Sequence, residues 1–154
     1  MKIAKRFAGH DREAGFTLVE LLIVMLVLTI LASIAMPAFF NQKTKATDSK
    51  AKGMAHTAQI AMETCNTSNG GTYSTTGCNL AGLRVIEPSI PATGVVVEPG
   101  TPTGGYTVKV TSTTGNTYIA RRESSGTLAF KCTVTASGRG GCPGTGTAEG
   151  TWGS

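Results

Sequence analysis

One carboxylate in this sequence stands where a charge is costly. Glu20 lies inside the run from Leu18 to Phe40, in which the only other residues that are neither apolar nor proline are Thr29 and Ser33. On insertion scales an acid at the middle of a membrane-spanning helix costs roughly 2.5 to 3.5 kcal/mol, and somewhat less near an end. The sequence therefore predicts either an oppositely charged partner for Glu20 or a position at the edge of the apolar region.

Four cysteines form the other reactive set, and all lie on the C-terminal side of the apolar run. They are Cys65, Cys78, Cys132 and Cys142. Their number and placement indicate two disulfides in an oxidising compartment, outside the cytosol. Three pairings are possible, and short loops favour Cys65 with Cys78 and Cys132 with Cys142.

The sequence contains no recognisable constellation for catalysis or for binding a metal or cofactor. It has no Gly-x-Ser-x-Gly, no His-Glu-x-x-His, no Cys-x-x-Cys and no phosphate-binding glycine loop. The only histidines, His10 and His56, have no obvious acid or nucleophile beside them. We therefore expect a protein that is not an enzyme and that uses no metal or cofactor.

The charge of the chain does not indicate nucleic-acid binding. The formal net charge is +5, and the first fifteen residues supply two of these units, with four basic residues against two acidic ones. A second basic cluster follows the apolar run; its members are Lys43, Lys45, Lys50 and Lys52. A solvated helix face near acidic lipid explains this cluster, so nucleic acid is not expected as a specific partner.

The apolar run is long enough to cross a bilayer as one helix, since about 20 apolar residues suffice. It also fits an ordinary secretory signal, with an apolar region from Leu21 to Leu31 and a possible cut after Ala35 that would release a soluble secreted binding protein. Against that interpretation, the preceding segment has fifteen residues and is rich in charge, and an export signal gains nothing from Glu20.

The start of the run resembles that of a type IV prepilin. A short basic leader precedes Gly15-Phe16-Thr17-Leu18-Val19-Glu20, and Pro37 lies inside the helix that follows. The resemblance implies that a membrane peptidase cuts between Gly15 and Phe16 on the cytoplasmic side and methylates the new amine of Phe16. In that family the carboxylate matching Glu20 pairs with this amine on a neighbouring subunit, and the stretch before the proline matching Pro37 can lose its helical form on assembly.

Physical chemistry is consistent with the implied roles. A carboxylate and an amine in a low-dielectric environment are costly alone and attract strongly together, so their burial as a pair would select the assembled state. The alternative is that Glu20 reaches the membrane interface and stabilises the positive end of the helix without a partner. Gly15 suits a cleavage site because a residue without Cβ allows the closest approach of a peptidase.

We predict an α+β fold of the type IV pilin kind, in which a long N-terminal helix packs against a small antiparallel sheet. The expected segments are a leader peptide (1–15), a transmembrane and assembly half-helix (16–40), an amphipathic half-helix (41–65), a connecting loop region (66–103), an antiparallel sheet (104–136) and a Gly-rich tail (137–154). Alternation of apolar residues within 104–136 predicts a three-stranded meander. Trp152 is expected to fold back on this sheet, with contact to a neighbour as the alternative.

These features together predict a structural subunit of a type IV pilus. We expect prepilin peptidase and the pilus assembly machinery as partners, storage in the inner membrane, and a homo-oligomeric helical filament at the cell surface that serves adhesion, motility or DNA uptake. A type II secretion pseudopilin or a minor pilin is the closest alternative, although calcium-binding acids typical of major pseudopilins are reduced here to Glu149 in the tail. The soluble secreted protein is the second alternative.

Overall fold

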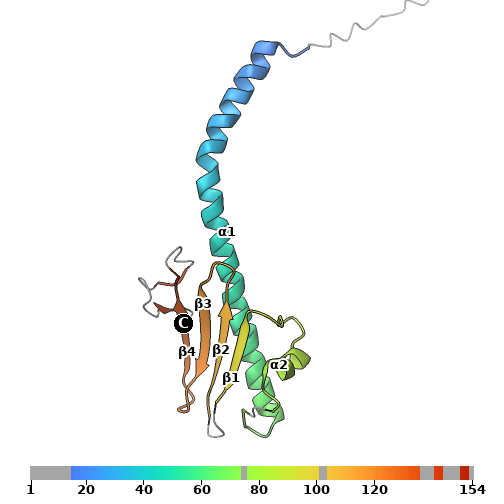
Figure 1. Cartoon of the computed structure of the whole chain (residues 1–154), viewed down its shortest axis with the longest axis vertical. Coiled ribbons are helices and arrows are strands. Elements are labelled where there is room, and N and C mark those ends of the chain that lie inside the picture. The colour runs from blue at the N-terminus through green and yellow to red at the C-terminus, as the bar shows by residue number, and fades with distance from the viewer. Residues whose placement is uncertain (1–14, 74–75, 101–103, 136–140, 144–149, 153–154) are drawn as a thin grey trace, which may run out of the picture. The chain divides into compact units, whose positions relative to one another are not determined.

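The structure is a computed structural model, and it describes residues 15–73, 76–100, 104–135, 141–143 and 150–152 (Figure 1). Its elements are α1 (Leu18–Ser68), α2 (Leu80–Ile86), β1 (Val95–Pro99), β2 (Tyr106–Thr111), β3 (Thr117–Arg122), β4 (Leu128–Thr133) and β5 (Gly150–Thr151). The chain divides into two compact units between Phe39 and Phe40, and α1 contributes to both. The fold is the predicted α+β arrangement, with a long apolar N-terminal helix and a small antiparallel sheet.

The sheet is an antiparallel meander in the order β1-β2-β3-β4-β5. Its central strands are the three that the alternation predicts, and Val110, Tyr118 and Cys132 stand opposite one another across them. Gly115 and Gly126 have φ values of 89° and 86° and close the two tight turns between these strands. Glycine tolerates such positive φ values better than other residues, so these two positions set where the meander turns.

The segment 66–103 is more regular than the predicted loop region, because it contains α2 and β1. The Asn79 side chain caps α2 by accepting a hydrogen bond from the Gly82 amide at 2.9 Å, and Leu83 is fully buried. The valines of β1 pair with β2 as an edge strand that ends at Pro99. Proline is acceptable there because an edge strand need not donate every amide to a neighbour.

Two boundaries and the tail also differ from the predicted segments. The helix begins at Leu18 instead of 16 and continues to Ser68, three residues past its expected end at 65. Two residues of the predicted tail form β5, and Trp152 follows it. The rest of the tail (136–140, 144–149 and 153–154) and residues 1–14 of the leader lie outside the described residues.

The face of α1 that is buried in the C-terminal unit consists mainly of small side chains. The helix face predicted from its periodicity is buried, with Met54 only partly so; its members are Ala51, Met54, Ala55, Ala58, Ala61, Met62 and Cys65. The sheet contributes a row of inward-facing residues to the same core, and this row includes Val108, Val110 and Tyr118. Burial of this apolar surface provides the main driving force for packing the helix on the sheet.

A buried carboxylate fixes one end of this interface. Asp48 of α1 is fully buried and accepts hydrogen bonds from the hydroxyl of Thr114 and from Nδ2 of Asn116, the latter at 2.8 Å. Burial, and next the negative charge of Asp48, raise the pKa of Tyr118 to about 12. Oδ1 of Asn116 in turn accepts a hydrogen bond from the backbone amide of Thr135 at 3.1 Å. Asp48 thereby ties the helix to the β2–β3 turn and to the residues that follow β4.

A second carboxylate, Glu63, joins α1 to the sheet further along the helix. Tyr106 and Arg122 donate hydrogen bonds to Oε1 at 2.7 and 2.8 Å, and Tyr73 donates to Oε2 at 2.8 Å. Desolvation raises the pKa of Glu63, but hydrogen bonds from Arg122 and the two tyrosines outweigh it, so the pKa lies below its ordinary value of 4.5. Burial and the hydrogen bond to Glu63 raise the pKa of Tyr73 to about 12.

We expect this cluster to make stability depend on pH. Because the pKa of Glu63 is lower in the folded protein, its stabilisation is present above about pH 4.5 and is lost as the pH falls through the folded value. Tyr73 makes stability depend on pH at the alkaline end. Because its pKa is raised in the folded protein, stability is lost as the pH rises from about 10 toward about 12. Glu63→Gln should lower the free energy of unfolding by about 1 kcal/mol at pH 7, a modest value because Glu63 is part exposed, and by much less at pH 3.

The measurement is denaturant unfolding of the full chain in detergent micelles, followed by the fluorescence of Trp152 between pH 3 and pH 7. Thr64→Ala, at an exposed neighbouring position on α1, should track the wild type at every pH. A Glu63→Gln difference that stays constant from pH 7 to pH 3 would contradict the assignment.

Two disulfides and Trp152 make further contacts within the C-terminal unit. The structure pairs Cys65 with Cys78 and Cys132 with Cys142, with Cα atoms 5.7 and 5.9 Å apart. Trp152 is buried against Tyr118 and donates its indole N–H to the carbonyl of Lys131. The prediction that Trp152 folds back on its own sheet is confirmed.

Candidate functional site

Thr17 defines where α1 starts. Gly15, Phe16 and Thr17 are not helical, and the first helical residue is Leu18. The Thr17 hydroxyl accepts a hydrogen bond from the backbone amide of Glu20 at 3.2 Å, and the Thr17 carbonyl accepts one from the amide of Leu21 at 3.2 Å. Thr17 is therefore the N-cap residue, because its side chain satisfies an amide that has no partner inside the helix.

The peptide between Gly15 and Phe16 is accessible. Gly15 is exposed, and a Cβ atom placed on it would have no described atom within 4 Å. Phe16 is 80% exposed. This peptide precedes the N-cap residue, so its backbone is free of the hydrogen-bonding pattern of α1.

Glu20 lies in the first turn of α1 and is exposed. None of the described residues forms a hydrogen bond or ion pair with its carboxylate; only its backbone amide is engaged, by Thr17. A negative charge in the first turn is stabilised by the positive end of the helix, by about 0.3 to 1 kcal/mol at an exposed position. In the described part of the chain, the positive end of the helix is what compensates this charge.

The apolar part of α1 is largely exposed in the described structure. Its large side chains expose between 47% of their surface, at Val24, and 79%, at Leu18. Among the described residues, α1 is the one helix long and apolar enough to span a membrane. The hydroxyl of Thr29 donates to the carbonyls of Met25 and Leu26, and Ser33 donates to Ile30, so these polar groups are satisfied within the helix.

Pro37 lies inside α1, which remains helical on both sides of it. Proline has no amide hydrogen, so the carbonyl four residues earlier lacks its usual helical donor. The position is a local weakness in the helix, and helical geometry persists through it in the single chain.

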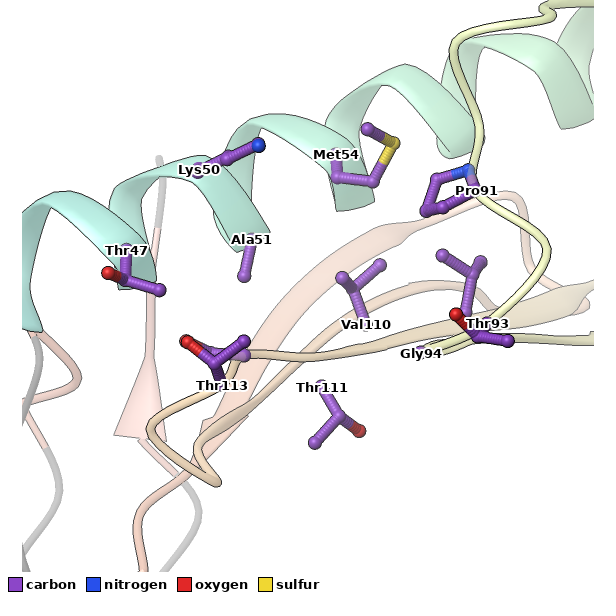
Figure 2. A pocket seen from close by; sticks show the side chains of 12 residues that line it. Thr47, Lys50, Ala51, Met54, Pro91, Thr93, Gly94, Val110, Thr111 and Thr113 are labelled. Carbon is purple, nitrogen blue, oxygen red and sulfur yellow. The ribbon is translucent and has the colours of Figure 1, made fainter.

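A groove in the C-terminal unit lies between α1 and the strand edge at β1. Its volume is about 260 Å³, and its walls combine α1 residues such as Lys50 and Met54 with Pro91 and Val110 on the opposite side (Figure 2). This volume falls below the usual size of small-molecule pockets, which is roughly 300 to 1,000 Å³. In the described part of the chain, no group of three or more His, Cys, Asp or Glu side chains is arranged to hold a metal ion.

The N-terminal geometry is that of an exposed apolar helix with an accessible Gly15–Phe16 peptide immediately before it. Residues 10–36 match the family model described as the prokaryotic N-terminal methylation motif. This motif is the cleavage and methylation signature of type IV prepilins and marks structural proteins of that kind. No solved structure matches the chain.

Sequence reasoning missed three polar residues that organise these elements. The N-cap role of Thr17 was readable, because Thr17 stands three residues before Glu20 and directly ahead of an apolar run, the spacing of a capping box. Asp48 lies three residues before Ala51 and seven before Ala55, and this helical spacing places it on the same buried face of α1. Glu63 gave no comparable signal, since its partners come from three separate segments.

Proposed function

We propose that the chain is the precursor of a structural subunit of a type IV pilus. Prepilin peptidase removes residues 1–15 by cutting between Gly15 and Phe16, and the amine of Phe16 is then methylated. The observation that carries the proposal is the placement of the complete motif immediately before α1, whose large apolar side chains from Leu18 to Leu31 are each at least 47% exposed. A bilayer before assembly and neighbouring helices afterwards provide the cover that these side chains need.

Glu20 is the residue that we assign to assembly. Cleavage creates an amine at Phe16, and a carboxylate in the first turn of a neighbouring helix can neutralise it. Both charges are costly in an apolar environment when alone, so pairing them favours the assembled register over others. Pro37 is assigned a secondary role, because the helix has one fewer hydrogen bond there and can change its local geometry at lower cost than elsewhere.

The proposed location follows from the two halves of the molecule. The apolar helix holds the subunit in the inner membrane before assembly, with residues 41–154 on the non-cytoplasmic side. Two disulfides in the C-terminal unit support this side, because they persist in oxidising compartments. The pilus assembly machinery then incorporates the subunit into a homo-oligomeric helical filament that serves adhesion, motility or DNA uptake.

Intact-mass and N-terminal analysis of the chain from its native cells, without reduction, tests processing and export together. The proposal predicts a chain that begins at N-methylated Phe16 and is lighter by four hydrogens, two for each disulfide. A chain beginning at Met36 would instead indicate ordinary secretion with a cut after Ala35, and a chain retaining the leader would overturn the proposal.

Deletion of the gene separates the pilus subunit from the two related classes. Loss of surface filaments supports a bulk pilus subunit. Intact filaments with loss of a secreted enzyme would indicate a type II secretion pseudopilin, and filaments that persist in reduced number would indicate a minor pilin.

A further inference from the structure

The first turn of α1 is placed just behind the peptide that the proposed peptidase would cut. Thr17 accepts the amide of Glu20 through its hydroxyl, and Gly15 and Phe16 precede the helix. Peptidases bind the backbone around the cleaved bond in an extended form. A cap one residue after Phe16 thus keeps the Gly15–Phe16 peptide in a conformation that can enter such a site.

The neighbouring residues show what the cap prevents. Phe16 is a poor N-cap residue, whereas glycine at an N-cap is nearly as favourable as threonine. If position 17 loses its acceptor, the next suitable cap toward the N-terminus is Gly15. A helix capped there would take in Phe16 and Thr17, and the Gly15–Phe16 peptide would become its first helical link.

We propose that Thr17 is a positioning residue for leader removal: its hydroxyl fixes the start of α1 at Leu18 and thereby keeps the Gly15–Phe16 peptide outside the helix, so that a peptidase can draw it into an extended form. This inference rests on the proposed function. Its support is the hydrogen bond from the Glu20 amide to the Thr17 hydroxyl, one residue after the Gly15–Phe16 peptide. Thr17 does not touch the reacting bond in this role; it acts through the conformation of the two residues before it.

The test is the rate of leader removal from the full-length precursor in lipid vesicles that contain prepilin peptidase, followed by mass spectrometry. Four variants separate capping from recognition of the threonine shape. Thr17→Ser and Thr17→Asn retain a capping oxygen and should be cleaved within about twofold of the wild type. Thr17→Val keeps the threonine shape without the acceptor and should be roughly threefold to tenfold slower. Thr17→Ala should be slower still, because alanine also favours extension of the helix.

The cleavage rate of Thr17→Asn relative to that of Thr17→Val decides the result. Capping predicts that the Asn variant is cleaved faster than the Val variant, whereas direct recognition of the threonine shape by the peptidase predicts the reverse and would overturn the inference. Equal rates for all four variants and the wild type would also overturn it. If the wild type itself is not cut after Gly15, the proposed function fails first, so the two failures are distinguishable.

A second readout reports the conformation directly. Amide exchange at Val19 in micelles should be slower in the Val variant than in the wild type, because a helix capped at Gly15 gives the Val19 amide the Gly15 carbonyl as an acceptor, and it should return to the wild-type rate in the Asn variant. Unchanged exchange at Val19 in the Val variant would contradict the capping role. Formation of both disulfides in each variant verifies that the C-terminal unit has folded.

Discussion

Glu20→Ala is expected to leave leader removal and membrane insertion intact and to lower incorporation into fibres at least tenfold. The variant removes the carboxylate that we assign to the amine of a neighbouring Phe16, so every interface that it enters buries an unpaired positive charge. Removing one partner of a buried ion pair typically costs about 3 to 5 kcal/mol, which exceeds the roughly 1.4 kcal/mol that corresponds to a tenfold change. The measurement is the ratio of variant to wild-type subunit in fibres from cells that express both.

Val19→Ala provides the matched control, because it shortens an adjacent exposed side chain in the same turn without changing charge. It should enter fibres at close to the wild-type level. If Glu20 acted only on the end of its own helix, Glu20→Ala would cost about 0.3 to 1 kcal/mol and would reduce incorporation only slightly. Wild-type yield from Glu20→Ala would refute the pairing.

Asp48→Ala is expected to produce the largest loss of stability, about 3 kcal/mol in the free energy of unfolding. The carboxylate is fully buried and accepts hydrogen bonds from Thr114 and Asn116, so its removal deprives both side chains of a charged acceptor inside the protein. Unfolding of the full chain in micelles can be followed through Trp152, the only tryptophan, which packs against Tyr118.

Two variants control this result. Ser49→Ala changes the adjacent, exposed residue of α1 and should alter stability by less than about 0.5 kcal/mol. Asp48→Asn keeps one acceptor oxygen and the shape of the side chain, so it should fall between the wild type and Asp48→Ala. An Asp48→Ala loss no larger than that of Ser49→Ala would show that the buried network contributes little to folding.

The helix and the central strands could be predicted because their signals are periodic and local. Tyr106, Val108 and Val110 alternate with polar residues, and the alanines of α1 recur at helical spacing. The edge strand β1 carries three consecutive valines, which show no alternation, and β5 has only two residues. Both strands exist because a neighbouring strand pairs with them, and that information is not present within either segment.

The candidate site divides in the same way. The peptide at Gly15–Phe16, the isolated charge of Glu20 and the apolar run after it are contiguous in sequence, so one short segment contains the whole pattern. The sequence does not show which groups bind Asp48 and Glu63, because their hydrogen-bond partners lie 66 and 68 residues away for Asp48, and 10, 43 and 59 residues away for Glu63. Only the fold brings these partners together.

The alanine face of α1 offers little resistance to sliding. Successive alanines present nearly the same small surface to the sheet, so a shift of one helical turn, about 5.4 Å along the axis, would bring similar groups into contact. Asp48 and Glu63 are fifteen residues apart on this helix, or about 22 Å. Asp48 binds donors of the β2–β3 turn, and Glu63 binds Tyr106 and Arg122 of the sheet. Two separated polar attachments therefore set the longitudinal alignment of helix and sheet, so that a load applied along the helix is transferred to the sheet at two fixed points.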